Sequence, residues 1–407
     1  MPNGCAWGTA TRHTMAWIFT FCSLLSLLLD YLMLSRLCHN PKRQRGWMIT
    51  LAILDTLPTI INLPLYLFSF DNHIPMSALA CWTNYLFMVG VVARLPFSFF
   101  YVISRNKWVR AVGAACSLVA VALFLYGMAV TRTDYVVNEV TIQSSRLPQA
   151  FDGYRIVQIS DIHAGNLVDA EKEIAEVVEL SNSLDANMVA FCGDMIDIRH
   201  SEITPQIVNI LKRLKATDGV YSITGNHDIG VYIRDSIRLT LKENTRQLME
   251  KQRQMGWRTL DNQTEYIHRG KDSISLTGIS FSQSLQEKRH SSNMSQVTLD
   301  SIYINTPREV FNITLVHLPQ LWDNIREAYP ADLTLSGHVH AMQIAAKVGQ
   351  WRLSPSMLLY KRWSGLYEEQ GRYLYINDGV GYGLYPMRIG ARPEITLLEL
   401  KCSQKQQ

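Results

Sequence analysis

Five short polar clusters beyond the first third of the chain combine residue types that bind divalent metals. The clusters are Asp161-Ile-His163, Gly193-Asp194, Gly225-Asn-His-Asp228, His317 and Gly337-His-Val-His340. Carboxylate oxygens, imidazole nitrogens and an amide oxygen together form a ligand set for divalent cations. Divalent-metal binding is therefore the first chemistry that these residues suggest.

Almost every cluster follows a short apolar run, which tells us how the clusters are positioned. The runs are 155–160, 187–192, 220–224, 311–316 and 332–336. Short runs rich in β-branched residues and bounded by Gly and polar residues are typical of buried strands. The carboxyl edge of an α/β sheet is where ligands bind. We therefore expect these strands to bring the polar side chains to one edge of a sheet.

Taken singly, each cluster has an ordinary structural explanation. Asp-x-His or Gly-Asp after a strand is commonly a turn or a helix cap, and Gly225–Asp228 could be a hairpin turn. The combination argues against this explanation, because five of the eleven His residues fall in these clusters. We interpret the other six His as solvated or interfacial.

The order of the clusters resembles the calcineurin-like metallophosphoesterase superfamily over about residues 149–400. The likeness is greatest to its membrane-associated bacterial branch, through Phe151–Asp161 and Pro386–Ile395. The resemblance implies an α/β fold, a four-layer sandwich of two mixed β-sheets flanked by helices. It also implies a dinuclear metal centre at one edge of the sandwich.

The resemblance assigns seven metal ligands in two sets joined by one bridging carboxylate. The ligands of the first metal would be Asp161, His163 and His340. The ligands of the second metal would be Asn226, His317 and His338. Asp194 would bridge both ions. Two divalent ions are expected, and neutral nitrogen with anionic oxygen ligands suits Mn, Fe or Zn.

Two further residues would act during catalysis by a metal-activated hydroxide. His227 would lie beside the substrate together with Asn226 and would donate a proton or hydrogen bond to the leaving oxygen. Asp228 could orient the ring of His227. One departure from the family pattern is visible, because Ala341 and Met342 stand where members usually have two Gly.

The first third of the chain has a different, strongly apolar character. Four runs approach the roughly 20 residues needed to cross a bilayer. They are residues 16–34, 47–70, 78–103 and 111–130. We expect residues 1–134 to form an all-α, four-helix, multi-pass transmembrane region. Residues 135–401 would then form the metallophosphoesterase domain.

The loops between these runs differ in charge, which predicts an orientation. Lys and Arg occur in 36–45 and 105–110, whereas 71–77 has neither. The positive-inside rule places the basic loops in the cytoplasm. The catalytic domain would then be extracytoplasmic, on a bacterial inner membrane. Within the membrane, Asp55 and Arg94 are expected to pair, because isolated charges there are costly.

Net charge and composition limit the classes of molecule that this protein is expected to bind. The net charge of +4 and the 18% of charged residues are too mild to argue for nucleic acid. The expected partners are a phosphorylated substrate, lipid-linked in one interpretation, and membrane lipids. Residues 354–370 join apolar, aromatic and basic side chains after the last cluster. We expect them to form a lid or a membrane-facing loop, although packing in the core would explain the same residues.

Three interpretations of the function stay open. The first is a membrane-anchored phosphoesterase that hydrolyses ester or pyrophosphate bonds of an envelope or lipid-linked phosphate. The second is a pyrophosphatase of a nucleotide-linked lipid such as UDP-diacylglucosamine. That substrate lies in the cytoplasm, so membrane topology separates the two. The third is a non-catalytic membrane scaffold with a vestigial metal fold, and the complete ligand set argues against it.

Overall fold

The computed structural model describes residues 6–67, 76–233, 239–282, 296–303, 306–349 and 351–403. The chain divides into two compact units. The first consists of Met1–Val130 with the short pieces Arg234–Ile237 and Gly383–Met387. The second consists of Thr131–Ile233, Arg238–Tyr382 and Arg388–Gln407.

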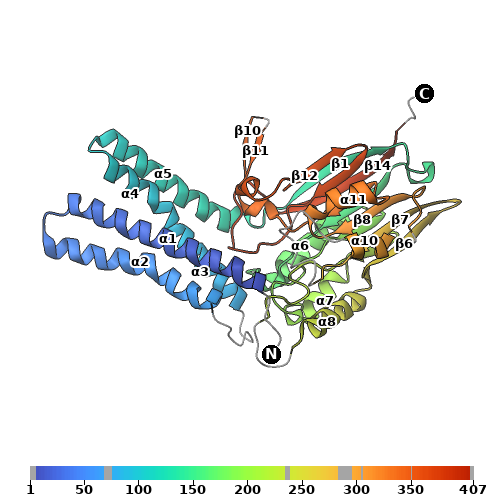
Figure 1. The fold of residues 1–407 in the computed structure, drawn as a ribbon, viewed down its shortest axis with the longest axis horizontal. Helices are drawn as coiled ribbons and strands as arrows, with labels where there is room; N and C mark the ends of the chain where they lie inside the picture. The colour runs from blue at the N-terminus through green and yellow to red at the C-terminus, as the bar shows by residue number, and fades with distance from the viewer. Residues whose placement is uncertain are drawn as a thin grey trace. The chain divides into compact units, whose positions relative to one another are not determined.

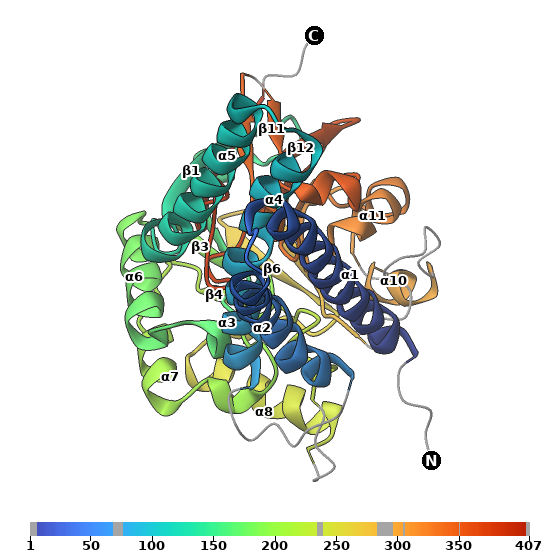
Figure 2. The ribbon, with the colours of Figure 1, turned by 90° about the vertical axis from the view of Figure 1, so that its left-hand side faces the viewer.

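The described part of the first unit is helical (Figures 1 and 2). Its segments are α1 (Ala6–Leu37), α2 (Pro41–Leu67), α3 (Met76–Gly90), the 3-10 turn η1 (Val92–Arg94), α4 (Leu95–Ile103), α5 (Lys107–Tyr126) and the π-helical turn η2 (Gly127–Thr131). Asn106 begins α5 because its side chain accepts a hydrogen bond from the backbone N–H of Trp108. Asn40 caps α2 in the same way, through the N–H of Lys42.

Among the described residues, three segments are long and apolar enough to cross a membrane, namely Phe19–Leu37, Ala78–Ile103 and Lys107–Thr131. The expected span 47–70 folds as helix α2, but it is not among these candidates. Polar residues such as Asp55 and Asn62 interrupt its apolar sequence, and residues 68–70 lie outside the described part. The expected count of four spans is therefore approximate.

The candidate span Ala78–Ile103 is a broken helix and not a continuous one. Helix α3 ends at Gly90, and α4 begins at Leu95 with Pro96 in its first turn. Proline has no N–H to donate to the preceding turn, so the first turn of a helix is the position where it costs least. The break places Arg94 between the two helices.

The second unit contains two six-stranded mixed sheets, as expected from the sequence. The first has the order β1 (Val136–Ser144), β14 (Glu394–Cys402), β2 (Tyr154–Ile159), β3 (Met188–Phe191), β4 (Val220–Ser222) and β5 (Arg258–Thr259). The second has the order β12 (Gly365–Glu369), β13 (Arg372–Ile376), β9 (Leu333–Ser336), β8 (Phe311–Val316), β7 (Asp272–Ile279) and β6 (Gln263–Arg269). Antiparallel pairing occurs between β14 and β2, β12 and β13, and β6 and β7. The remaining pairs are parallel.

Helices cover the outer faces of the two sheets. They are α6 (Ala170–Ser183), α7 (Pro205–Leu211), α8 (Leu241–Gln254), α10 (Gln296–Tyr303) and α11 (Trp322–Ala328). The 3-10 turns are Gln149–Phe151, Ala164–Asn166, His200–Glu202, Pro319–Leu321, His340–Gln343 and Pro355–Leu358. A separate hairpin joins β10 (Ala346–Val348) to β11 (Trp351–Leu353).

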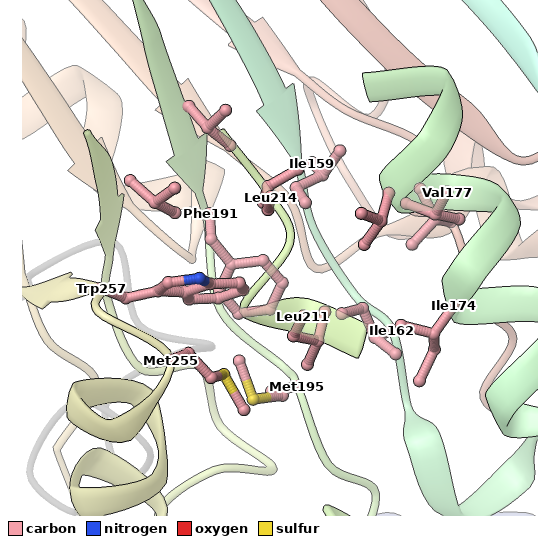
Figure 3. Packing of buried hydrophobic residues seen from close by; sticks show 14 of the residues in the cluster. Ile159, Ile162, Ile174, Val177, Phe191, Met195, Leu211, Leu214, Met255 and Trp257 are labelled. Atoms are coloured by element: carbon pink, nitrogen blue, oxygen red, sulfur yellow. The ribbon is translucent and has the colours of Figure 1, made fainter. Parts of the chain in front are cut away.

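Three apolar clusters hold these layers together. Between the sheets, Ile156 and Tyr221 of the first sheet pack in one cluster with Leu315 of the second. On the outer face of the first sheet, the rings of Phe191 and Trp257 lie 5.5 Å apart beside α6 and α7 (Figure 3). The third cluster joins α10 and α11 to the second sheet. The second unit is therefore the expected four-layer sandwich.

Candidate metal centre

The five polar clusters lie at the carboxyl ends of β2, β3, β4, β8 and β9. The ends of the two sheets are tied together, because Nδ1 of His317 donates to the carbonyl oxygen of Cys192 at 2.8 Å. Nε2 of Gln158 likewise donates to the carbonyl oxygen of Ser336 at 2.9 Å. Strands from both sheets therefore supply side chains to one edge of the sandwich, as the sequence predicted.

The backbone at this edge has an unusual conformation. Five cluster residues have left-handed φ values between 48° and 76°: Asp161, His163, Asp194, His338 and His340. Such values cost free energy for residues other than Gly and are concentrated at functional sites. The loops also approach each other closely, since a Cβ on Gly225 would lie 2.2 Å from Oδ1 of Asp194. The fold thus holds the cluster side chains inward at an energetic cost.

Asp161, His163 and His340 form the first donor group. Nε2 of His340 lies 3.0 Å from Oδ1 of Asp161 and 3.2 Å from Nε2 of His163. One ligand atom from each of the three residues lies within 4.8 Å of the others. The backbone N–H of His338 and the hydroxyl of Ser160 hold the Asp161 carboxylate in place.

Asp194, His317 and His338 form another donor group, with ligand atoms again within 4.8 Å of one another. Nε2 of His317 lies 3.0 Å from Oδ2 of Asp194 and 3.1 Å from Oδ1 of Asn226. Because Nδ1 of His317 donates to a carbonyl, Nε2 is the atom left to face a metal. All seven residues predicted as ligands are therefore brought together.

His163, Asp194 and His227 form a third group that overlaps the other two. The backbone N–H of His227 donates to Oδ1 of Asp194 at 2.8 Å. The His227 ring donates from Nδ1 to the carbonyl oxygen of Asp197 at 2.6 Å. Asp194 thus lies between donors from both sides.

The partner of the His227 ring corrects one expectation. Asp228 was expected to orient that ring, but its carboxylate accepts backbone N–H groups of Asp194, Met195, Ile196 and Gly225. Asp228 therefore fixes the two loops that carry Asp194 and Asn226. The ring contacts Asp197 instead, because the chain turns after His227 and directs the next side chain inward.

Asp197 is a site residue that the sequence reasoning missed. Its Oδ1 lies 3.2 Å from Nδ1 of His163 and 3.5 Å from Nδ1 of His227, and it accepts from Nδ2 of Asn166 at 2.8 Å. A carboxylate behind an imidazole fixes its tautomer and its orientation. The only sequence signal was the spacing Asp194-x-x-Asp197, which lies just beyond the cluster that we singled out.

The charges of the site favour a cation. Burial lowers the pKa of His317, but the carboxylates of Asp194 and Asp161 outweigh it and raise that pKa to about 9. Burial is likewise outweighed at His163 by Asp197 and Asp194, which raise its pKa to about 9. Burial would raise the pKa of Asp194, yet His317 and His227 hold it well below its usual range. Protons thus occupy the imidazoles where positive charge is needed.

The side of the site that is not closed carries aromatic rings. Among the cluster histidines, His227 and His338 are half-buried and the others are buried. The Tyr232 ring lies 4.3 Å from that of His227, and the Tyr360 ring lies 6.2 Å from that of His338. The hydroxyl of Tyr232 also accepts from Nδ2 of Asn226 at 3.3 Å. These two tyrosine rings thus lie next to the two half-buried histidines of the site.

Ala341 and Met342, which stand where family members usually have two Gly, adopt an unusual backbone conformation. Ala341 and Met342 adopt left-handed φ values of 49° and 46°, where Gly would be unstrained. Ala341 is fully buried, and its carbonyl oxygen accepts from the hydroxyl of Ser354 at 2.7 Å. The turn after His340 therefore keeps the glycine-type backbone without glycine.

The residues fit divalent metal. Carboxylate and imidazole ligand atoms lie within 4.8 Å of one another in three overlapping groups, and the amide oxygen Oδ1 of Asn226 lies 3.1 Å from Nε2 of His317. Nε2 of His163 and Nε2 of His340 face each other at 3.2 Å. An α/β sandwich with such a donor set at one edge defines a metal-dependent hydrolase domain.

Comparison with known proteins agrees with this class. Residues 154–342 match the family described as calcineurin-like phosphoesterase. The uncharacterized metallophosphoesterase YkuE of Bacillus subtilis (strain 168) is 28% identical over 65% of this chain and 85% of its own length. The transmembrane protein with metallophosphoesterase domain of Danio rerio is 28% identical over 78% of this chain and 70% of its own length. The uncharacterized metallophosphoesterase YkoQ of Bacillus subtilis (strain 168) is 26% identical over 68% of this chain and 94% of its own length.

The chain is therefore a metal-dependent phosphoester hydrolase with apolar N-terminal helices. Its residues 154–342 form a domain that matches the calcineurin-like phosphoesterase family.

Proposed function

We propose that this protein is a membrane-anchored, two-metal phosphoesterase, with residues 1–134 as the transmembrane region and 135–401 as the catalytic domain. The observation that carries the proposal is the overlap of the three donor groups, because His163 and Asp194 each belong to two of them. Two adjacent ions could share these donors. When bound, they would supply positive charge for the phosphate oxygens and an activated water for attack.

The proposed ligands keep the roles expected from the sequence. The first ion would take Asp161, His163 and His340. The second would take Asn226, His317 and His338, and Asp194 would bridge them. Asp197 and the Cys192 carbonyl would hold the imidazoles of His163 and His317 in the required tautomers. The mixture of nitrogen and oxygen donors suits Mn, Fe or Zn.

His227 and Asn226 are proposed to contact the substrate, and His227 to protonate the leaving oxygen. Donation from Nδ1 to the Asp197 carbonyl leaves Nε2 of His227 as the atom that can face substrate. To act as an acid, Nε2 must carry the second proton of an imidazolium. Burial lowers the pKa of His227, which makes its imidazolium a stronger proton donor. Asp228 would contribute by holding the loops and not by touching the ring.

The finer part of the proposal is an envelope or lipid-linked phosphate as substrate. The side chains of the expected lid differ in exposure. Leu358 and Leu359 are 86% and 70% exposed, whereas Trp363 is 9% exposed and packs in a core. Trp351 is also exposed (66%), and exposed Lys347 lies nearby in sequence. Exposed Trp and Leu with a basic residue suit a membrane surface. Because Tyr360 adjoins His338, this apolar stretch supports a substrate held at such a surface.

The test uses the purified full-length chain in micelles. Metal analysis should find two divalent ions per chain, and a panel of phosphomonoesters, phosphodiesters, pyrophosphates and lipid phosphates should show hydrolysis. Leu358→Ser with Leu359→Ser should lower turnover of a lipid phosphate and spare a small soluble aryl phosphate. Leu366→Ser, on the exposed edge strand β12, is the matched control. Equal loss on both substrates would remove the lipid part of the proposal.

A topology reporter together with the same substrate panel separates the alternative functions. Alkaline phosphatase fused after Arg132 should be active, because the domain is proposed to be extracytoplasmic, at a bacterial inner membrane. An inactive fusion, together with cleavage of UDP-diacylglucosamine, would favour the nucleotide-linked lipid. A protein that binds no metal and hydrolyses nothing would be the vestigial scaffold.

A further inference from the structure

The helical unit contains a buried ionic cluster that joins three of its segments. Asp30 lies on α1, Asp55 on α2 and Arg94 on η1, and both carboxyl groups are 0% exposed. Nη2 of Arg94 lies 3.0 Å from Oδ2 of Asp30 and also contacts Oδ1 of Asp55. The pairing of Asp55 with Arg94 that the sequence predicted is confirmed. Asp30 is an unexpected second acid on the same guanidinium nitrogen.

Hydroxyl groups complete the surroundings of the two acids. Ser98 of α4 donates to Oδ1 of Asp30 at 2.7 Å, and Ser26 of α1 donates to Oδ1 of Asp55 at 3.3 Å. Oδ2 of Asp55 is buried and has no hydrogen-bond partner among the described residues. Within the described ranges, Arg94 is the sole Lys, Arg or His within 4.0 Å of either carboxylate, so α3, α4 and α5 add no charge to the cluster.

The charges of this cluster do not balance when both acids are ionised. Two carboxylates and one guanidinium leave one negative charge, and isolated charge within a membrane segment is costly. Two carboxyl groups that share one site hold a proton between them, because both cannot ionise readily. One proton would make the cluster neutral. The unpartnered Oδ2 of Asp55 provides an oxygen to carry it.

The broken helix gives the cluster a side that packing does not close. A pocket of about 400 Å³ lies between η1, α4 and α5, and it is lined by Arg94 and Ser117 among apolar residues. Ser117 accepts the backbone N–H of Phe97 at 2.9 Å, a group released by the break. Irregular backbone is tolerated at membrane depth where it lines such a cavity.

We propose that Asp30, Asp55 and Arg94 form an intramembrane proton-binding site, in which the two carboxyl groups hold one exchangeable proton. A metal ion is a poorer occupant, because the guanidinium already fills the space between the carboxylates and the nearby hydroxyls donate to them. The helical unit is then more than an anchor, since it carries a titratable centre of its own.

Infrared spectroscopy of the full-length protein in micelles tests this proposal. At neutral pH the wild type should show the C=O band of a protonated aspartic acid, and that band should shift in D₂O. It should be missing from both Asp30→Asn and Asp55→Asn, because one carboxylate then balances Arg94 alone. Glu179→Gln, on the exposed face of α6, is the control that should leave the band unchanged.

Thermal unfolding of the same variants gives an independent measurement. Each single Asn variant mimics the protonated acid, so its Tm should stay close to that of the wild type. The double Asn variant leaves Arg94 uncompensated, so its Tm should fall by much more than the two single changes together. If a single variant fails to accumulate, Asp30→Glu should retain the band at a shifted position.

Four results would overturn the proposal. The wild type could lack the band, or the band could survive both Asn substitutions. Losses of Tm in the two single variants could add strictly in the double variant. A rise of the wild-type Tm with Na⁺ but not with K⁺, absent from the Asn variants, would assign the site to a metal cation instead.

Discussion

The metal centre and the membrane cluster both gather buried carboxylates, but they do so by opposite means. At the metal centre, strand ends and left-handed backbone turns bring Asp161, Asp194 and five imidazoles together. In the helical unit, Asp30 and Asp55 meet on helices, around Arg94. The first site has ligand atoms but no permanent cation of its own. The second already contains a cation, the Arg94 guanidinium, and the proposal adds one proton to it.

This difference sets what each site can bind. Imidazoles can be neutral, so the metal centre can exchange its protons for divalent ions. Arg94 always stays charged, so the membrane cluster has room for little besides a proton. Substitution of Asp194 should therefore change metal content and turnover. Substitution of Asp55 should change the net charge and protonation of the buried cluster.

The largest effect is expected from Asp194→Asn, because Asp194 belongs to two donor groups. Loss of this proposed bridging charge should remove at least one metal equivalent. It should lower kcat/KM by more than about 100-fold, because changing a residue that only supports a metal ligand already costs about 10–100-fold. Metal analysis and turnover measure this. Glu179→Gln is the control for loss of one negative charge. Full metal content with normal turnover would disprove the two-metal assignment.

His227→Ala should keep both metals but slow turnover by roughly 10²–10⁴-fold if the ring is the acid. Since the acid form is the imidazolium and burial lowers its pKa, activity of the wild type should decline as pH rises through that pKa. The decline should disappear in the variant. His268→Ala, at an exposed His, is the control. Loss of metal from His227→Ala would make this residue a ligand instead.

Asp197→Asn should cost about 10–100-fold in metal affinity or turnover, because Asp197 supports the rings of His163 and His227 from behind. The fold should persist, since the Asn side chain can still accept a hydrogen bond. Metal titration followed by activity assays measures the effect. A variant with wild-type affinity and turnover would show that the carboxylate charge at this position is unimportant.

These residues show where sequence reasoning succeeds. The convergence of the seven proposed ligands was predictable because each follows its strand directly, and a strand end fixes where its next residues lie. Asp197 was missed because its role depends on how the loop after Asp194 folds back. The contact of Asp228 was wrong because neighbours in sequence can point to different sides of a turn.

The helical unit was less predictable for a related reason. An apolar run predicts a helix but not its partners, so Asp30 carried no signal of its pairing with Arg94. The break at Val91–Arg94 was hidden in one apolar run, where Pro96 is compatible with either a kink or a new helix start. Long-range packing between α1, α2 and η1 decides both features.

The pH dependence of stability should distinguish the metal-free from the metal-loaded centre. The pKa values of His163 and His317 are raised to about 9 in the folded chain, against about 6.5 when unfolded. Their stabilisation is therefore complete below about pH 6.5 and is lost as pH rises through about 9. The Tm of the EDTA-treated protein should fall over this range. The Tm of the metal-loaded protein should fall less over this range, because metal binding to the imidazoles becomes stronger as their protons are lost.

A rising or constant Tm in EDTA between pH 6.5 and 9 would contradict this expectation. His268→Ala should not alter the slope, since that residue is exposed. His317→Asn should flatten it, because one of the two raised pKa values is then removed.

The smallest effect is expected from Met342→Gly, in the turn that follows the last ligand. A left-handed φ of 46° costs an L-residue roughly 1–2 kcal/mol. Glycine removes that cost but loses about 0.5–1 kcal/mol through the greater freedom of the unfolded chain. The net gain in unfolding free energy should therefore lie between about 0 and 1.5 kcal/mol. Thermal or denaturant unfolding of the metal-loaded protein measures it.

Ala341→Gly is the matched comparison for this turn. Its φ of 49° is nearly the same, but its methyl group packs against Val339 and Trp363 in a buried cluster. The strain relieved should be similar, while the lost contacts and the added freedom offset it, so Ala341→Gly should be neutral or destabilising. If Met342→Gly lowered stability as much as Ala341→Gly does, the methionine side chain and not the backbone would decide the energy of the turn. The favourable packing of the side chains would then outweigh the strain of the backbone beside His340.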